Sequence, residues 1–443
     1  MSIILGDTCK KTMEENLFDV IIIGAGAAGL MAAWELVQTG KHTAVIEAKD
    51  YVGGRIHTIQ DKNFELPVEL GAEFVHGDLE LTKLILKKAG VETYPVKGDI
   101  RQNEDKSLDE QSDFIEDYSA LNKKFKEVKE DISVAEFFEK HLQGKEFEEL
   151  RFSLKNYVEG YYAADTGKAS TLALKEELTK SDDEQFRVEG GYVKLVDYLQ
   201  EQCKEKGVQF FLSHPVIEIQ WKKDQVNVIT ANGNFSARKI LITVPVGVLQ
   251  SETIRFSPAI PGIIEASKKL GFGPVIKTLL QFDKAFWKNK EFTKGKDLEK
   301  LSFLFSEAII PTWWTYHPKD VAMLTGWSGG PNADEIKHLS GKEILGKALE
   351  SLGKIFSIDI NLLEQKLRGW HVANWVNDPY SCGGYSYDVV NGGEFKQIIK
   401  KPIENTIYFA GEGLYDGPEI GTVEAALNTG RETAHQMIAD FKS

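Results

Sequence analysis

Apolar and polar residues follow a regular order at the start of the chain. An apolar run, Asp19–Ile23, leads into the glycine-rich turn Gly24–Gly29, and apolar residues then recur at helical spacing from Leu30 to Gln38. A second apolar run ends at Glu47. Strand, glycine turn, helix, strand and acid in this order predict a βαβ unit of the dinucleotide-binding type.

Beyond this unit the chain divides into stretches of helical and of strand character. Charged residues dominate from Gly98 to Glu130, and the apolar residues among them recur at helical spacing, so we expect a helical region there. The same spacing predicts helices over Leu79–Ala89, Val134–Phe138, Leu150–Val158, Leu339–Phe356 and Thr422–Ile438. Short apolar runs predict strands over Val208–Leu212, Val216–Trp221, Val226–Thr230, Lys239–Val244 and Phe272–Phe282. Met1 to Leu17 is expected to be a loose leader.

Composition narrows the function only a little. The net charge of −14 over 443 residues argues against nucleic acid and anionic membranes as partners, and it suits a cationic substrate weakly. No apolar run approaches the roughly 18 residues of a membrane helix, and the start of the chain does not resemble a secretory signal. Cys9, Cys203 and Cys382 are too far apart for a disulfide framework or a metal site. We therefore expect a cytoplasmic protein of two domains without a metal, either a monomer or a homodimer.

The first glycine turn carries the most specific chemistry. Gly24 lets the chain turn out of the strand, Gly26 lets backbone N–H groups approach a pyrophosphate, and Gly29 lets helix and strand pack closely. Glu47, about 20 residues further on, is placed to accept hydrogen bonds from a ribose 2′-OH. An ordinary βαβ unit with small residues in its turn is the alternative.

Further motifs follow in a characteristic order. Gly53-Gly54-Arg55 resembles the FAD-binding family of the glutathione-reductase type, in which an arginine contacts phosphate and helps to fix the flavin. Together with Gly71–Gly77, Gly190–Tyr192, Tyr408–Glu412 and Gly421–Ala426, the chain resembles the flavin-containing amine oxidases (monoamine oxidases, polyamine oxidases and their demethylase relatives) over nearly its whole length. The resemblance implies FAD contacts from Gly24, Gly26, Ala28, Gly29, Glu47, Ala48, Gly54, Arg55, Gly71, Ala72, Glu73, Phe74, Val216, Trp375, Gly411, Glu412, Gly421, Thr422 and Val423.

The last motif can also be interpreted from its residues. A helix that begins near Gly421-Thr422 presents free N–H groups, which stabilise the negative charge that reduction places on a flavin. A plain helix cap is the alternative, and Glu412 is otherwise a surface acid.

Lys277 stands in an apolar strand between Val275 and Leu279. Because burying an unpaired ammonium is costly, this lysine must reach solvent, pair or take part in the chemistry. An edge-strand lysine that reaches solvent is the structural alternative. The resemblance implies that Lys277 holds a water against the flavin.

An aromatic cage for the amine is implied by the same resemblance. Tyr385 matches the cage position, and its ring face would attract a cation and exclude water; Trp375 stands nearby in sequence. Core packing is the alternative for both. His76 falls where related enzymes have a pocket histidine, and a buried structural histidine is equally consistent with the pattern. Glu419 replaces a second aromatic wall and either binds an ammonium or is solvated.

The expected fold is α/β and α+β: a Rossmann-like FAD-binding domain of the glutathione-reductase type with an inserted mixed-sheet and helical substrate domain. We expect the FAD-binding domain at 16–78, 188–265 and 379–443, and the substrate domain at 79–187 and 266–378. The expected activity is oxidation of a small cationic amine to an imine and then an aldehyde, with O2 reduced to H2O2.

Two rival functions and one detail of the cofactor depend on single positions. An L-amino-acid oxidase or related monooxygenase needs an arginine for the substrate carboxylate, and the matching position here is Phe74. A non-catalytic flavin-binding scaffold is the rival of another class. Monoamine oxidases tether FAD through a cysteine just before the cage tyrosine, where this chain has Gly384, with Cys382 two residues earlier. Two residues of extended chain span roughly 6–7 Å, so we expect non-covalent FAD.

Overall fold

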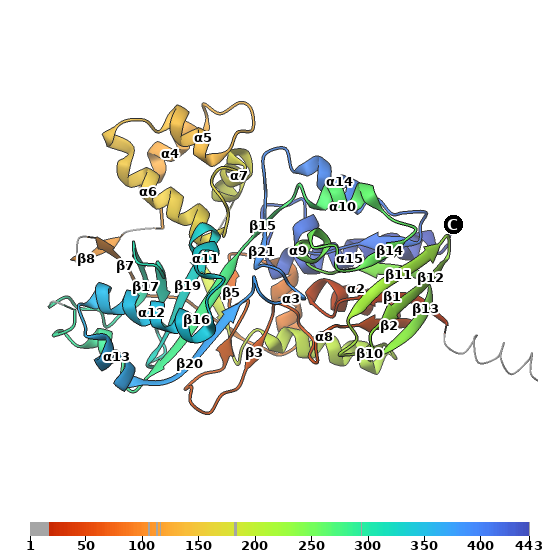
Figure 1. Ribbon diagram of the computed structural model, residues 1–443, viewed down its shortest axis with the longest axis horizontal. Coiled ribbons are helices and arrows are strands. Elements are labelled where there is room, and N and C mark those ends of the chain that lie inside the picture. Colours follow the sequence, from red (N-terminus) through yellow and green to blue (C-terminus); the bar gives the residue numbers. More distant parts are fainter. Residues whose placement is uncertain are drawn as a thin grey trace, which may run out of the picture.

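The computed structural model describes residues 17–104, 107–111, 114–115, 117–180, 184–293 and 295–442. The expected leader lies outside these residues except for Leu17, which opens the first strand, and Cys9 lies outside them too. None of the helices described is long and apolar enough to cross a bilayer. In Figure 1 a large sheet and the helices packed on it lie at the right of the molecule, and a second sheet lies at the left. A group of helices lies above the second sheet.

Within the described residues, the first sheet has eight strands in the order β10-β2-β1-β13-β12-β11-β14, with β22 also paired to β13. The strands β10, β2, β1, β13 and β22 run parallel, whereas β12 runs antiparallel to both of its neighbours. Their bounds are β1 Leu17–Ile23, β2 Thr43–Ile46, β10 Gln209–Phe211, β11 Val216–Lys222, β12 Gln225–Thr230, β13 Gly233–Ile242, β14 Arg255–Ser257 and β22 Ile407–Phe409.

Helices cover both faces of this sheet, as a parallel sheet requires. Val20 and Ile22 of β1 pack towards α2, α8 and α15, while Ile21 and Ile23 pack towards α9, α10 and α14. The helices are α2 Ala27–Gln38, α8 Val193–Glu205, α9 Val246–Gln250, α10 Pro261–Ser267, α14 Gly393–Lys400 and α15 Val423–Asp440. Because both faces are covered, the residues from Val20 to Ile23 of β1 are all apolar. The strands of this sheet come from three separate stretches of the chain.

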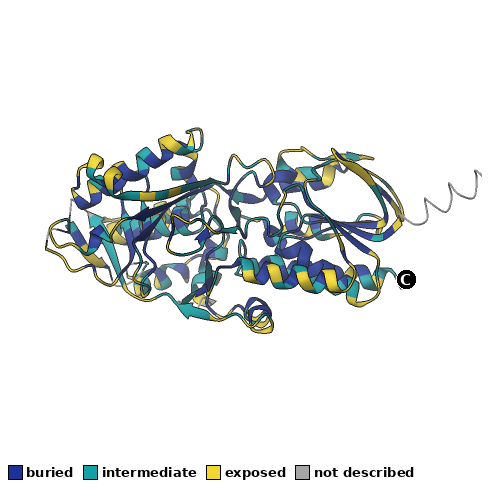
Figure 2. Ribbon diagram, turned by 90° about the horizontal axis from the view of Figure 1, so that it is seen from below, coloured by how far each residue is buried: buried dark blue, intermediate teal, exposed yellow. Residues whose placement is uncertain are grey.

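The second sheet has seven described strands in the order β20-β16-β19-β18-β17-β7-β8. They are β7 Asp99–Glu104, β8 Ser107–Gln111, β16 Val275–Phe282, β17 Leu301–Ser306, β18 Thr312–Trp314, β19 Met323–Gly329 and β20 Leu367–Asn374. A large apolar core, which includes Trp287 and Trp313, joins this sheet to η3 Phe286–Lys288, α11 Gly330–Ile336, α12 Gly341–Phe356 and α13 Ile360–Lys366. The dark blue interior of Figure 2 shows that both sheets are buried along their middle.

The helices above the second sheet form a lobe with its own apolar core (Figure 1). They are α4 Tyr118–Phe125, α5 Val134–His141, η1 Lys145–Phe147, α6 Glu148–Asn156, η2 Tyr157–Tyr161 and α7 Thr171–Lys180. The short turn η2 is a π-helix, in which the N–H of Tyr162 donates to the carbonyl of Tyr157. Such turns insert an extra residue into a helix and are frequent at functional sites.

Three small sheets connect the larger parts. They consist of β3 Thr58–Ile59 with β4 Val68–Glu69; β5 Phe74–His76 with β9 Gln185–Val188 and β6 Thr93–Pro95; and β15 Gly271–Gly273 with β21 Tyr385–Tyr387. The helix α3 Glu80–Lys88 and the turn η4 Glu412–Leu414 complete the described elements.

The α/β and α+β class is confirmed, but the sequence prediction is wrong in two places. The segment expected to be helical from Gly98 to Glu130 begins with the hairpin β7–β8, and only α4 is helical. The hairpin extends the second sheet through β17 and buries Leu108, so sheet pairing outweighs the charged composition. The single strand expected over Phe272–Phe282 is divided at Pro274 into β15 and β16, which belong to different sheets.

Candidate active site

The glycine turn lies between β1 and α2. Gly24 has φ +103°, and a Cβ on it would lie 2.8 Å from Oγ1 of Thr243. A Cβ on Gly29 would lie 2.0 Å from the carbonyl oxygen of Gly24, so helix and turn meet at a distance that only glycine allows. The close packing places the amino end of α2 at the turn, where dinucleotide-binding folds bind phosphate through free backbone N–H groups.

Glu47 follows β2 and holds the glycine turn. Its Oε2 accepts the N–H of Ala25 at 2.7 Å, and its Oε1 accepts the N–H of Lys49 at 2.9 Å. Burial raises the pKa of Glu47, although the hydrogen bonds from these backbone groups oppose the shift. The carboxyl group also borders the main cavity, where its remaining lone pairs are available to a ribose hydroxyl.

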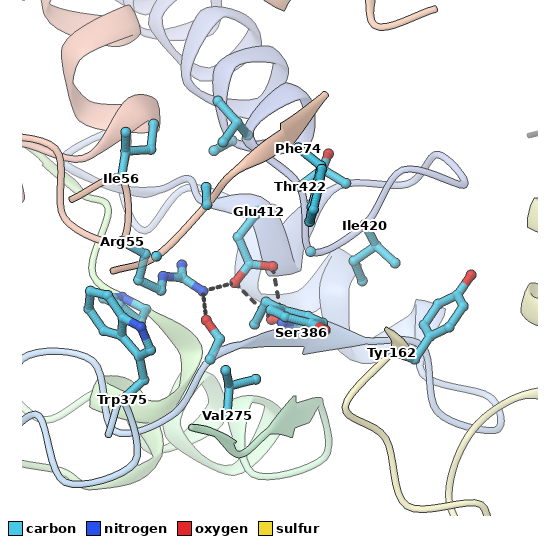
Figure 3. Close-up of a pocket in the computed structure, with 18 of the residues that line it drawn as sticks. Arg55, Ile56, Phe74, Tyr162, Val275, Trp375, Ser386, Glu412, Ile420 and Thr422 are labelled. Carbon is cyan, nitrogen blue, oxygen red and sulfur yellow. Dashed lines mark hydrogen bonds and ion pairs between the residues drawn. The ribbon is translucent and has the colours of Figure 1, made fainter. Parts of the chain in front are cut away.

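Arg55 joins the first nucleotide-binding segment to the end of the chain, as Figure 3 shows. Its Nη1 donates to the carbonyl of Gly384 and to Oε1 of Glu412, both at 2.7 Å. Glu412 is buried and also accepts the backbone N–H of Ser386 at 3.3 Å. The charge of Arg55 is therefore balanced by a residue more than 350 positions away.

The amino end of α15 approaches the same region. Gly421 has φ +81°, and a Cβ there would lie 3.2 Å from the ring of Tyr385. Thr422 caps the helix: its Oγ1 accepts the N–H of Ala425 at 3.2 Å and donates to the carbonyl of Glu419 at 2.6 Å. The positive end of a long helix dipole thus lies at this side of the site.

The loop after β4 passes close to Arg55 and Trp375. A Cβ on Gly71 would lie 1.9 Å from the carbonyl oxygen of Arg55 and 3.1 Å from the ring of Trp375. The indole N–H of Trp375 donates to the carbonyl of Leu70 at 2.8 Å, and the N–H of Ala72 donates to that of Arg55 at 3.0 Å. Trp375 is therefore fixed against the loop, with its ring forming part of the cavity wall.

Lys277 lies in the middle of β16 and is 1% exposed. Its Nζ donates to Oε2 of Glu73 at 2.7 Å and to the carbonyl of Gly71 at 3.2 Å. Pairing across strands and loop is thus how the protein accommodates this charge, and the edge-strand alternative is excluded. Lys277 also lines the cavity, so it is both paired and placed at the cavity wall.

Glu73 is the centre of a buried charge cluster. Besides Lys277, its carboxylate accepts Nε of Arg187 at 2.9 Å and the indole N–H of Trp314 at 3.0 Å. Burial alone would raise the pKa of Glu73, but the adjacent Lys277 and Arg187 outweigh burial and lower it. Both oxygens of Glu73 are therefore occupied by the chain's own donors, although the residue borders the cavity.

Aromatic side chains enclose one end of the cavity. The ring of Tyr385 stacks on Trp327 with centroids 6.2 Å apart, and Trp327 lies 5.8 Å from Trp314. The hydroxyl of Tyr385 donates to the carbonyl of Tyr161. His76 meets the ring of Tyr161 edge to face at 5.2 Å, which places a titratable ring in this chamber.

These parts enclose a single cavity of about 920 Å³. It runs from the glycine turn to the aromatic chamber, and Lys277, Tyr385, His76 and Glu419 all line it. All but one of the residues expected to contact FAD line this cavity, and the exception is Gly29. Those that line it are Gly24, Gly26, Ala28, Glu47, Ala48, Gly54, Arg55, Gly71, Ala72, Glu73, Phe74, Val216, Trp375, Gly411, Glu412, Gly421, Thr422 and Val423. A cradle of glycines, a ribose acid and a helix amino end along one cavity fit an FAD molecule.

Several residues of the site were not expected from the sequence. Arg187, which pairs with Glu73 behind the cavity wall, gives no signal because this partner is 114 residues away. Tyr157 lies in the predicted helix Leu150–Val158, and Tyr161 and Glu177 follow it where no individual element was predicted. A run of three tyrosines within six residues was the one available hint of an aromatic wall.

The fold and this cavity define an FAD-dependent oxidoreductase whose cavity ends in an aromatic chamber. The model of the flavin-containing amine oxidoreductase family matches residues 27–438, so the chain belongs to that family. It is therefore an enzyme that oxidises amines with FAD.

Individual relatives agree with this assignment. The chain is 29% identical to polyamine oxidase 2 of Arabidopsis thaliana, covering 95% of this chain and 88% of the relative. Its fold matches cyclohexylamine oxidase from Brevibacterium oxydans with a TM-score of 0.78 at 21% identity, over 96% of this chain and 100% of the other. Wild-type putrescine oxidase bound to putrescine matches with a TM-score of 0.77 at 18% identity, over 96% and 99%.

When bound, FAD would accept the electrons released as the C–H bond next to the amine nitrogen is broken. The protein would orient the substrate and provide the electrostatic environment. The described residues that would hold it are the glycine turn, Glu47, Arg55 and the amino end of α15.

Proposed function

We propose that this enzyme oxidises a small diamine or polyamine, with O2 as the electron acceptor, to an imine that water hydrolyses to an aldehyde. The charge balance of the cavity carries the proposal. Each lysine or arginine that lines it within the described residues is paired with a carboxylate: Lys49 with Asp378, Arg55 with Glu412 and Lys277 with Glu73. Glu177 and Glu419 also line it, and neither forms an ion pair in that part of the chain.

This balance favours an ammonium over a carboxylate as the recognised group. An L-amino acid would need a free cation, and Phe74 stands at the position where amino-acid oxidases need an arginine. Arg187 lies 4.8 Å from the ring of Phe74, but its charge is directed to Glu73. The amino-acid oxidase alternative is therefore not favoured.

The aromatic chamber suits a cation as well. The ring faces of Tyr385 and Trp327 attract an ammonium and keep water away from it. Burial lowers the pKa of His76 to about 4, so its imidazole is neutral at physiological pH and does not repel a cationic substrate. The names of polyamine oxidase 2 and of putrescine oxidase support the same class of substrate.

Within this function we assign roles to the site residues. Lys277 holds a water beside the flavin, Tyr385 and Trp375 form the walls that orient the amine, and His76 and Glu419 contact the substrate. We further propose that the FAD-binding domain comprises 16–78, 188–265 and 379–443, and that the enzyme is cytoplasmic, since Cys203 and Cys382 are both free thiols. The oligomeric state is proposed to be a monomer or homodimer.

Anaerobic reduction of the flavin tests the proposal directly. The purified enzyme is mixed with diamines, polyamines, alkylamines and L-amino acids, and the loss of flavin absorbance is followed in time. We expect diamines or polyamines to reduce the flavin fastest and amino acids slowest. Preferential reduction by an ordinary L-amino acid would overturn the proposal.

A further inference from the structure

A carboxylate on helix α7, that of Glu177, borders the cavity and has no charge partner among the described residues. Oε1 of Glu177 lies 3.4 Å from the hydroxyl of Tyr157, while Oε2 is buried and accepts no hydrogen bond from any residue that the structure describes. Burial raises the pKa of Glu177 well above its usual value; the hydrogen bond from Tyr157 opposes the shift, and nearby Glu419 and Asp388 add to it. A buried carboxyl group with an unused oxygen is costly unless a ligand completes it.

A continuous aromatic wall connects Glu177 to the reacting end of the cavity. Tyr385 donates to the carbonyl of Tyr161, whose ring stacks on Tyr157 at 5.0 Å and 19°. Tyr157 in turn donates to Glu177. Both rings belong to the helical turn η2, in which side chains four residues apart lie on the same face.

Glu419 lies near Glu177 from a different element. It stands in the loop before α15, and its neighbour Ile420 shares a small second cavity with Leu174 of α7. Both acids therefore border the main cavity where α7 meets this loop. Two carboxyl groups beside stacked aromatic rings form a site for an organic cation, since rings and carboxylates both stabilise positive charge.

We propose that Glu177 binds the distal ammonium of a diamine or polyamine while the other end of the same molecule is oxidised beside Tyr385. Glu419 supports the same ammonium, and the tyrosines of η2 line the hydrocarbon chain between the two ends. The distance from Tyr385 to Glu177 then selects the spacing between the two nitrogens. This inference rests on the proposed function, because it needs a substrate with two positive charges.

The test compares substrates with and without the second charge. We would measure kcat/KM for a series of α,ω-diaminoalkanes and for n-alkylamines of equal chain length, in the wild type and in Glu177→Gln. The ratio of diamine to monoamine efficiency should fall about 10- to 100-fold, the range expected for one hydrogen-bonded charge. Glu176→Gln, an exposed neighbour on the same helix, should change the ratio by no more than about twofold.

Two further measurements separate binding from a structural role. Glu177→Asp should shift the preferred diamine to a longer homologue, since its carboxylate is withdrawn by one methylene. Calorimetric titration of a diamine into the dithionite-reduced, oxygen-free enzyme measures affinity without turnover, and that affinity should fall in Glu177→Gln by the same factor. If Glu177→Gln does not fold, the chain-length shift in Glu177→Asp decides.

The possible outcomes distinguish the two proposals. A wild-type enzyme without preference for diamines refutes the proposed substrate class and this site together. A wild-type preference that survives in Glu177→Gln, or a parallel loss for both kinds of amine, refutes the role of Glu177 alone.

Discussion

Replacing Lys277 by methionine is the most direct test of the site. The change removes the Nζ that lies 2.7 Å from Glu73 and 3.2 Å from the carbonyl of Gly71, and it keeps an unbranched apolar side chain of similar length. If Lys277 holds the water beside the flavin, turnover in Lys277→Met should fall at least ~10²-fold, a loss typical of a positioned proton-transfer group.

The cost to stability follows from the partners that Glu73 keeps. Breaking a buried ion pair from one side costs about 3–5 kcal/mol. Glu73 retains Nε of Arg187 at 2.9 Å and the indole of Trp314 at 3.0 Å, so we expect a value near the lower end, about 3 kcal/mol. The variant should therefore fold and still bind FAD, which its visible absorbance would show.

Arg187→Met is the matched control, because it removes the other cation from Glu73. Arg187 does not line the cavity, so this variant should lose similar stability but less than about tenfold in turnover. The assay is stopped-flow reduction of the flavin by a saturating amine, with urea unfolding measured in parallel. Unchanged turnover in Lys277→Met, or an equal loss in Arg187→Met, would refute the assigned role.

Three further predictions concern the cofactor, acidity and packing. FAD should be released into the supernatant on acid precipitation, because Cys382 does not line the cavity whereas Gly384 does; flavin retained on a peptide around Cys382 would contradict this. The pKa of His76 is lowered from 6.5 to about 4, so the unfolded chain binds the proton more readily, and stability should fall as the pH drops from 6.5 towards 4. From pH 7 to pH 5, protonation of His76 in the unfolded chain should lower the free energy of unfolding by about 2 kcal/mol. Urea unfolding of His76→Asn should not show this loss, and an equal loss in both proteins would disprove the lowered pKa of His76. Gly29→Ala places a Cβ 2.0 Å from the carbonyl oxygen of Gly24, so it should yield protein with little bound FAD, as measured by the flavin-to-protein absorbance ratio; a normal ratio would show that the turn can relax.

The cofactor half of the site was predictable from sequence because its chemistry is local. The glycine turn, Glu47 and the start of α15 each depend on residues that are adjacent or one βαβ unit apart. The substrate half was less predictable, since its contacts span long separations. Arg187 of β9 meets Glu73 only when segments 114 residues apart come together, and Glu177 meets Tyr157 only when α7 packs on η2. The hairpin β7–β8 was missed because its pairing with β17 lies about 200 residues away.

The ion pair between Arg55 and Glu412 has a consequence for how the protein folds during its synthesis. At roughly 5–20 residues per second, a ribosome makes Glu412 about 20–70 s after Arg55, because the two residues are 357 positions apart. Until then β13 lacks its neighbour β22, and α2 lacks α15, against which it packs. The glycine turn is therefore synthesised long before the cavity that surrounds it can close. FAD can therefore be enclosed only after β22 and α15 have been made and have packed against β13 and α2.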